Sequence, residues 1–383
     1  MFEPLVDFIR EQYATRDPIP LHAPVFVGKD RAYVLDTIDS TFVSSVGRYV
    51  DRFEQDVARY TGCGRAVAVV NGTAALHVAL RLVGVQAGDL VITQALTFVA
   101  TCNAISYCGA EPVFVDVDQH TLGLSPRAMD AWLDANARID SDGTCRTRDT
   151  GQPIRACVPM HTFGHPVDLD ALVEVCRRWR IALVEDAAES LGSFYKGRHT
   201  GTFGVVATLS FNGNKIITTG GGGMILCDEQ TGARAKHLTT TAKVAHPFAY
   251  EHDELGYNYR LPNLNAALGC AQLELLDRFV EAKRVMAARY ARFLSGSSLK
   301  FVTEPTDCRS NYWLNAVICE DRAQRDALLA HTNGQGVMTR PIWVLMSRLP
   351  MYKGARRDEL TRSQWLEDRV VNLPSSVLPE YLR

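Results

Sequence analysis

Several features that would place the chain in a specialised class are missing from its 383 residues. No two of its ten cysteines have CxxC spacing, no apolar run exceeds strand length, and no repeat or low-complexity stretch is present. The N-terminal segment carries Glu3 and Asp7 and lacks the basic start and apolar centre of a signal peptide. The net charge of -2 provides no basic excess for nucleic acid or acidic membranes. We therefore expect a cytoplasmic protein with reduced thiols, no membrane segment, no nucleic-acid partner and no metal site.

Strand and helix patterns alternate from about residue 48 to 240, which predicts an α/β fold. Strands are predicted at 66–70, 90–93, 112–115, 155–160, 181–185, 205–211 and 223–227. Helices are predicted at 48–60, 73–82, 98–108, 125–137 and 169–179, and the polar stretch 139–153 is predicted to be a surface loop. The alternation favours a mostly parallel central sheet with helices on both faces.

The pattern changes after Arg260, which suggests a second, smaller unit. Residues 264–293 fit one long helix or two abutting helices, and later residues mix strands and helices. We predict a large domain at 25–275 and a small α+β domain at 276–383, onto which residues 1–24 pack.

One lysine has an unusual setting. Lys215 stands between the apolar run 205–211 and the glycines at 220–223, and the next charged residue after it is Asp228. An amine held in a tight, poorly hydrated pocket is an effective nucleophile toward carbonyl groups. The alternative is a lysine at a strand end whose amine reaches water.

Three further features fall at predicted strand ends, where ligands bind to parallel sheets. Gly72 and Thr73 open a helix and could bind a phosphate, although Thr73 could also be a plain helix cap. Asp186 could pair with a cationic ring nitrogen, or it could complement a helix dipole. Phe98 could stack on a flat cofactor, or it could be a core residue.

A phosphate site, a carboxylate for a pyridinium, an aromatic ring and a nucleophilic lysine are together what pyridoxal phosphate requires. At these positions the chain resembles the DegT/StrS family of pyridoxal-phosphate-dependent sugar-nucleotide aminotransferases. The resemblance rests on NGTAALHVAL (71–80), TFVATCNAI (97–105), EPVFVDVD (111–118), HTFGHPVDLD (161–170), EDAAESLGS (185–193), SFNGNKIITTGGGG (210–223) and GYNYRLPNLNAALG (256–269). It implies an aspartate-aminotransferase-like fold of type I.

The resemblance also implies roles for individual residues. Lys215 would bond covalently to the cofactor and act as the catalytic base. The other expected cofactor contacts are Gly72, Thr73, Phe98, His161, Asp186, Ser210, Asn212 and, from the second subunit of a homodimer, Asn258. Glu189 departs from the family, since many members carry Gln there; a contact of Glu189 with the cofactor is expected, and its role stays open.

The resemblance implies L-glutamate as amino donor, a nucleotide-linked ketosugar as acceptor, and pyridoxamine phosphate between the two half-reactions. The stretch 239–250 is most similar to the branch that makes precursors of legionaminic acid. That branch aminates the 4-keto carbon of a UDP- or GDP-linked 2-acetamido-2,6-dideoxy sugar. Lys243, His246 and Arg260 would then contact the nucleotide or sugar, or alternatively the dimer interface.

Other functions stay open at this point. The acceptor could be a 3-keto sugar, a 4-keto sugar without the acetamido group, or a cyclitol ketone. A pyridoxal-phosphate-dependent sugar dehydratase is disfavoured because that branch replaces the lysine with histidine. A binding protein that has lost activity is disfavoured because Lys215, Asp186 and the Gly72–Thr73 pair are all present.

Overall fold

The computed structural model describes residues 2–382 of the chain. Its helices are α1 (Glu3–Tyr13), α2 (Asp30–Asp39), α3 (Arg48–Thr61), α4 (Gly72–Leu82), α5 (Val99–Tyr107), α6 (Pro126–Asn136), α7 (Leu169–Trp179), α8 (Glu229–Thr239), α9 (Asn263–Leu273), α10 (Leu276–Phe293), α11 (Arg322–Gly334) and α12 (Thr361–Glu367). Its strands are β1 (Arg65–Val69), β2 (Leu90–Gln94), β3 (Glu111–Val115), β4 (Ala137–Ile139), β5 (Cys145–Thr147), β6 (Ile154–Val158), β7 (Ala182–Asp186), β8 (Phe194–Tyr195), β9 (Arg198–His199), β10 (Val206–Ser210), β11 (Gly223–Cys227), β12 (Lys300–Phe301), β13 (Cys308–Arg309), β14 (Asn315–Ile318), β15 (Arg340–Pro341) and β16 (Val370–Leu373).

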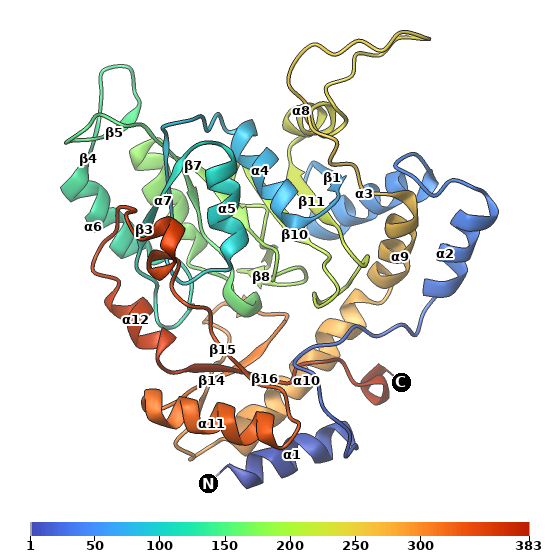
Figure 1. The fold of residues 1–383 in the computed structure, drawn as a ribbon, viewed down its shortest axis with the longest axis vertical. Coiled ribbons are helices and arrows are strands. Elements are labelled where there is room, and N and C mark those ends of the chain that lie inside the picture. The colour runs from blue at the N-terminus through green and yellow to red at the C-terminus, as the bar shows by residue number, and fades with distance from the viewer. Residues whose placement is uncertain (1, 383) are drawn as a thin grey trace.

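A seven-stranded sheet forms the centre, in the order β1-β11-β10-β7-β6-β2-β3 (Figure 1). The strands from β10 to β3 pair in parallel, and β11 runs antiparallel to both of its neighbours. The sheet is therefore mostly parallel, as the sequence predicted, and β11 makes it mixed. Continuous apolar sequences form these strands because both faces of the sheet are covered by helices.

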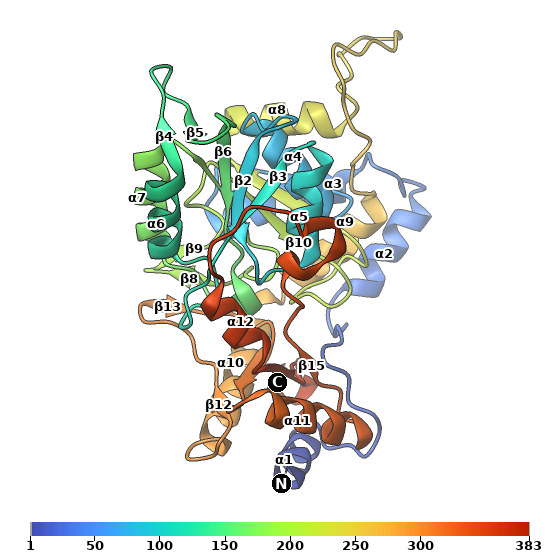
Figure 2. The same cartoon turned by 60° about the vertical axis from the view of Figure 1, so that its left-hand side comes forward.

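Separate apolar clusters lie on the two faces. One joins the central strands to α4, α5 and α8 through residues such as Leu76, Ile105 and Leu238. Another joins them to α6 and α7 through residues such as Leu133 and Trp179. Figure 2 shows α6 and α7 beside one another on one side of the molecule. These layers fix the strand ends, which hold the candidate site.

A second sheet of four strands, β12-β14-β16-β15, lies at the other end of the molecule, near the N-terminus (Figure 1). A separate apolar cluster covers it and combines Ile9 of α1 with Tyr290 of α10, Leu328 of α11 and Val371 of β16. The N-terminal helix thus packs on the same unit as the C-terminal strands. The division into domains at residue 275 stays a prediction.

Two sequence-based expectations need correction or refinement. The stretch 139–153 is not only a loop, because β4 and β5 form a hairpin closed by a turn in which Gly143 has a φ of +80°. The stretch 264–293 is two helices, α9 and α10, that meet at Glu274 and Leu275. None of the described helices combines the length and apolar character needed to cross a bilayer.

Candidate active site

A cavity of about 490 Å³ lies between the carboxyl ends of the central strands and the second sheet. The residues lining it that the sequence predicted as site residues are Gly72, Thr73, Phe98, Asp186, Glu189, Ser210, Asn212 and Lys215. They come from four separate stretches of the chain. The crossover topology brings these stretches to one edge of the sheet.

A turn suited to phosphate joins β1 to α4. Asn71 caps the helix by accepting a hydrogen bond from the backbone N–H of Ala74 at 2.7 Å. The first-turn N–H groups of a helix have no partner within the helix, and the positive end of its dipole attracts anions. A Cβ at Gly72 would lie 3.0 Å from the Cβ of Ser210, so glycine keeps this part of the cavity open.

Asp186 lies buried at the end of β7. Its Oδ2 accepts a hydrogen bond from the Thr101 hydroxyl at 2.7 Å, and its Oδ1 accepts one from the backbone N–H of Ala188 at 3.2 Å. Burial raises the pKa of this carboxyl, and the Thr101 hydrogen bond opposes the rise. A cation in the cavity would stabilise the carboxylate, because a buried charge without a partner is costly.

The neighbouring acid, Glu185, has a structural role. It accepts hydrogen bonds from the backbone N–H groups of Gly201, Phe203 and Gly204, each at 2.7 Å. His161 Nδ1 accepts from the Val167 N–H, so Nε2 carries the proton and donates to Glu185 at 3.1 Å. His161 is fully buried and does not line the cavity, in contrast to the position expected near the ring. Burial raises the pKa of Glu185, but the hydrogen bonds outweigh it and the net shift is downward.

The amine of Lys215 has two close neighbours. Its Nζ lies 3.4 Å from Glu189 Oε1 and 3.9 Å from the centroid of the Trp313 ring. No charged residue follows Lys215 in the sequence before Asp228, but the fold brings the carboxylate of Glu189 to the lysine from a different segment. Burial raises the pKa of Glu189 from its ordinary value of 4.5 to about 7, although the Lys215 charge and the Phe163 N–H oppose the shift.

Phe98 is not a core residue. It precedes α5, its side chain is 49% exposed, and it lines the cavity, where a flat ring could stack on it. The cavity therefore offers a phosphate turn at one strand end, a buried carboxylate at another, and an amine near both. This donor set fits a phosphorylated pyridine aldehyde.

Sequence reasoning missed the residues that the second sheet and the segments next to its strands contribute. Trp313, Arg340, Trp343 and Asn372 all line the cavity. Trp313 is fixed by a hydrogen bond of 2.7 Å from its Nε1 to the carbonyl of Asn214, next to Lys215. The sequence carried no signal for these four, because no motif surrounds them and they lie about 100 residues or more beyond Lys215.

The remaining predicted residues lie outside this cavity. Lys243, His246 and Arg260 line a separate open pocket at the base of the arm 243–255, which projects from the top of the molecule in Figure 1. Asn258 accepts hydrogen bonds from the Arg260 guanidinium at 3.0 and 3.1 Å. Within one chain, these four residues do not contact the cavity around Lys215.

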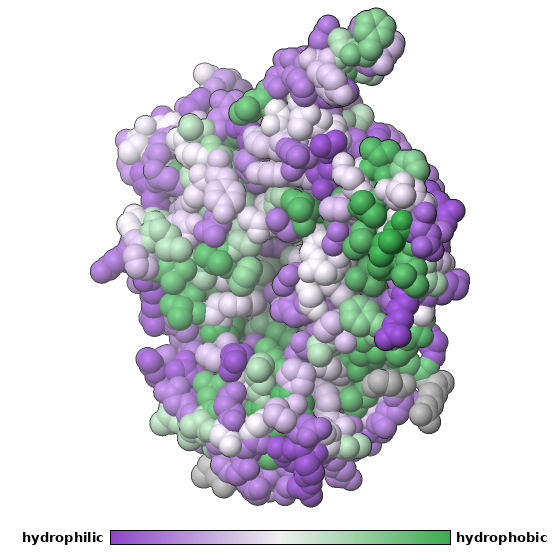
Figure 3. All heavy atoms as spheres, turned by 45° about the vertical axis from the view of Figure 1, so that its right-hand side comes forward, coloured by the Kyte–Doolittle hydropathy of each residue, from purple (hydrophilic) through white to green (hydrophobic). Residues whose placement is uncertain are grey.

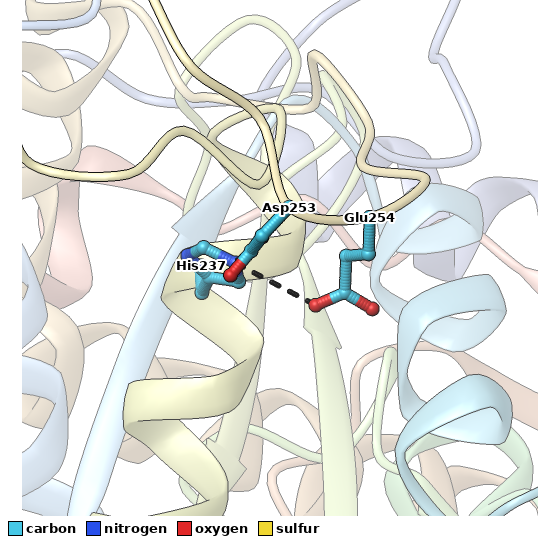
Figure 4. Close-up of side chains that lie close together, drawn as sticks. All are labelled: His237, Asp253 and Glu254. Atoms are coloured by element: carbon cyan, nitrogen blue, oxygen red, sulfur yellow. Dashed lines mark hydrogen bonds and ion pairs between the residues drawn. The ribbon is translucent and has the colours of Figure 1, made fainter.

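A cluster of potential metal ligands also lies near the arm. Figure 4 shows His237 of α8 beside Asp253 and Glu254. His237 Nε2 lies 2.7 Å from Asp253 Oδ1, and Glu254 is already paired with the Arg234 guanidinium. These contacts hold the end of the arm against α8.

Comparisons with known proteins agree with this geometry. A model of the DegT/DnrJ/EryC1/StrS aminotransferase family matches residues 26–379. The GDP-perosamine synthase of Escherichia coli O157:H7 is 37% identical over 361 residues, which is 93% of each chain. The GDP-perosamine synthase of Vibrio cholerae is 35% identical and covers 93% of this chain and 94% of its own. The crystal structure of the aminotransferase TlmJ from Streptoalloteichus hindustanus is 28% identical, with a TM-score of 0.84 over 94% of this chain and 93% of that one.

Proposed function

Because the chain belongs to the DegT/DnrJ/EryC1/StrS aminotransferase family, we propose that it moves an amino group from L-glutamate to the 4-keto carbon of a nucleotide-linked sugar. The chain is a pyridoxal-phosphate-dependent sugar aminotransferase with the fold-type I architecture predicted from its sequence. The donor, the 4-keto position and the identity of the sugar are the proposed parts.

The observation that carries the proposal is the position of Lys215 relative to the acids around it. Its Nζ is 3.4 Å from Glu189 and shares one cavity with Asp186 and with the phosphate turn at Gly72. When bound, pyridoxal phosphate supplies an electron sink for the carbon that carries the amino group. Asp186 would hold the ring nitrogen, and the N–H groups of the turn, with Ser210, would hold the phosphate.

Lys215 would then act as the base of the reaction. Its amine would remove the proton from the α-carbon of the donor and, in the reverse direction, return a proton to carbon 4 of the acceptor. Trp313 and Phe98 would help to exclude water from the reacting carbon, because both line the cavity with large apolar surfaces.

Two acceptors merit a direct comparison. Perosamine is a 4-amino sugar, and relatives with the printed name GDP-perosamine synthase are 35–37% identical to this chain. These relatives favour a GDP-linked 4-keto-6-deoxyhexose. The stretch 239–250 favours the legionaminic-type acceptor, a UDP- or GDP-linked 2-acetamido-2,6-dideoxy-hexos-4-ulose. Lys243, His246 and Arg260 would contact the nucleotide in either case.

We also propose a cytoplasmic homodimer in which each site receives Asn258 and Arg260 from the other subunit. The arm exposes Phe248, Tyr250 and Leu255 to 86%, 83% and 80%, which is unusual for such side chains in a lone subunit. A second group of exposed apolar residues surrounds α2: Phe26, Val27, Leu35, Ile38, Phe42, Val43 and Val46. Figure 3 shows apolar side chains gathered on the face that carries this helix.

The test is a matched panel of acceptors. Holoenzyme is incubated with L-glutamate and, separately, GDP-linked 4-keto-6-deoxymannose and the UDP- and GDP-linked 2-acetamido-4-keto sugars. We expect a 4-amino product from one of these classes and its loss in Lys215→Ala. Formation of product from a 3-keto sugar or a cyclitol ketone alone would refute the proposed acceptor class.

A further inference from the structure

One buried side chain, that of Asn311, joins the two residues that contact the Lys215 amine. Asn311 stands in the short segment between β13 and β14 and is fully buried. Its amide Nδ2 donates to the backbone carbonyls of Glu189 at 2.9 Å and Leu191 at 2.8 Å. Its Oδ1 accepts from the backbone N–H of Trp313 at 2.8 Å. Both donors of the amide are therefore used to hold the loop after β7, and its oxygen holds Trp313.

The backbone around Asn311 is shaped for this contact. Gly164 has a φ of +95°, and a Cβ at this position would overlap Asn311 Oδ1, so glycine admits the amide. Tyr312, the next residue, has a φ of +46°, a conformation that persists in a bulky residue only where the surroundings hold it. The backbone N–H of Asn311 also donates to Ser193 Oγ at 2.9 Å. The segment is thus fixed against the loop that carries Glu189.

Trp313 is anchored at each of its polar groups. Its backbone N–H is held by Asn311, and its carbonyl accepts from the amine of the buried Lys283 at 3.0 Å. Its indole Nε1 donates to the carbonyl of Asn214 at 2.7 Å. These contacts set the ring centroid at 3.9 Å from Lys215 Nζ, where an indole face attracts a cation.

The carboxylate of Glu189 defines a second side of the amine. Its Oε1 lies 3.4 Å from Lys215 Nζ, and its Oε2 accepts from the Phe163 N–H at 2.8 Å. A catalytic base must come within hydrogen-bond reach of the proton that it removes. The position of a free Lys215 amine therefore depends on the two neighbours that Asn311 holds.

We propose that Asn311 is a positioning residue for the proton transfer that Lys215 performs, an inference that rests on the proposed aminotransferase function. Asn311 does not line the cavity, so it acts through Glu189 and Trp313 and not on the substrate. In the step concerned, the C–H bond at the α-carbon of the donor breaks and the proton moves to Lys215 Nζ. The electron pair passes into the bound cofactor.

The donor half-reaction tests this role without any sugar nucleotide. Holoenzyme is mixed rapidly with L-glutamate, and the absorbance change per bound cofactor gives an apparent Kd and a limiting rate. The measurement is repeated with L-glutamate deuterated at the α-carbon. The variants are Asn311→Ala and the isosteric Asn311→Asp. The control is Asn315→Ala, which removes another buried asparagine, 1% exposed, whose Nδ2 donates to Ser375 Oγ at 3.1 Å.

We expect Asn311→Ala to lower the limiting rate by about 10- to 100-fold, because a displacement of about 1 Å at a reacting group can cost about 100-fold. The apparent Kd for L-glutamate should stay within about threefold, since the contact acts on the chemical step. Deuteration should slow this variant at least as much as the unchanged enzyme. Asn311→Asp keeps an oxygen for the Trp313 N–H but loses the amide donor to Glu189, so its loss should be intermediate. Asn315→Ala should stay within about twofold, because both neighbours of the amine remain in place.

A second measurement needs neither cofactor nor turnover. The cofactor-free proteins are treated with a limiting amount of acetic anhydride, and mass spectrometry compares the labelling of Lys215 with that of the exposed Lys300. The side chain of Lys215 is 13% exposed. Asn311→Ala should raise its relative labelling by at least about threefold, because an amine released from its neighbours is open to solvent for more of the time.

Three results would overturn the role of Asn311. The first is an equal limiting rate in Asn311→Ala and Asn315→Ala, and the second is unchanged labelling of Lys215. The third is a smaller isotope effect, which would assign the loss to a step other than proton removal. Should Asn311→Ala fail to fold, Asn311→Asp decides the same three points. An unmodified holoenzyme that reacts with no amino acid would overturn the aminotransferase proposal, whereas the labelling would still show whether Asn311 positions the amine.

Discussion

At the scale of single residues, Glu189 has an ambiguous charge state near neutral pH. Its side chain is 3% exposed, which disfavours the carboxylate, whereas Lys215 Nζ at 3.4 Å and the Phe163 N–H at 2.8 Å favour it. The balance leaves its pKa raised to about 7. Glu189 is thus a group that can hold or release a proton beside the reacting amine.

Replacing Glu189 with Gln should remove a pH-dependent cost to stability. The folded-state pKa lies above the ordinary value of 4.5, so ionisation disfavours folding, and the loss of stability develops as pH rises from about 4.5 to about 7. The cost is on the order of 3 kcal/mol above pH 7. The measurement is denaturant unfolding after removal of the cofactor. Between about pH 4.5 and pH 7, the free energy of unfolding of the wild type should fall more than that of Glu189→Gln.

The same substitution has a spectroscopic consequence in the holoenzyme. Glu189→Gln should shift the pH titration of the bound cofactor's absorbance, because a titrating group beside Lys215 is lost. Two results together would contradict this account of Glu189. The free energy of unfolding would have the same pH dependence in wild type and in Glu189→Gln, and the absorbance titration of the cofactor would be unchanged.

Single residues also show what the sequence could predict. The positions of Lys215, Asp186 and Gly72 at the cavity were predictable, because each lies at or within a few residues of the end of a hydrophobic strand. The contacts of the Lys215 amine with Glu189 and with the Trp313 ring were not predictable from the sequence, because they depend on how distant segments of the chain meet. The burial of His161 outside the cavity lining was not predictable, because a motif gives the order of residues along the chain and not the direction of a side chain; its contact with the cofactor stays a prediction.

At the scale of elements, the turn between β1 and α4 depends on close contact with β11. A Cβ at Gly223 would lie 2.5 Å from the carbonyl carbon and oxygen of Asn71, the residue that caps α4. Backbone atoms cannot move aside as side chains do. Glycine in β11 therefore sets the position of the phosphate turn.

Gly223→Ala should destabilise the protein by about 1–3 kcal/mol and weaken binding of pyridoxal phosphate, because the strand and the turn must separate. The matched control is Gly354→Ala, where an added Cβ meets no atom within 4 Å. Thermal unfolding and cofactor titration check both effects. Equal stability and cofactor affinity in the two variants would contradict this account of the turn.

The elements of the central sheet were predicted well because buried parallel strands are continuous apolar runs bounded by helices. The hairpin of β4 and β5 was missed because its strands are short and rich in polar residues, so no periodic signal marks them. The break between α9 and α10 was left open, because neither proline nor glycine lies at Glu274 and Leu275.

At the scale of the whole molecule, the proposed dimer predicts complementation between two inactive variants. Lys215→Ala lacks the base, and Asn258→Ala lacks the residue supplied to the partner's site. When equal amounts of the two variants are mixed and allowed to reassociate, half of the dimers should contain one chain of each variant. Each of these mixed dimers has one intact site. Activity should return to about a quarter of the wild-type level.

Light scattering of the unmixed proteins supplies the control, since each variant should be a dimer by itself. A mixture that stays inactive although the chains have exchanged would show that every site is built from one chain.

The central claim is that Lys215 is the amine that bonds to the cofactor, and one measurement tests it directly. The purified holoenzyme is reduced with borohydride, digested, and mapped by mass spectrometry. The account predicts pyridoxal phosphate attached to Lys215 and no labelled peptide in Lys215→Ala. A label on another lysine, or none on a holoenzyme that turns over normally, would contradict it.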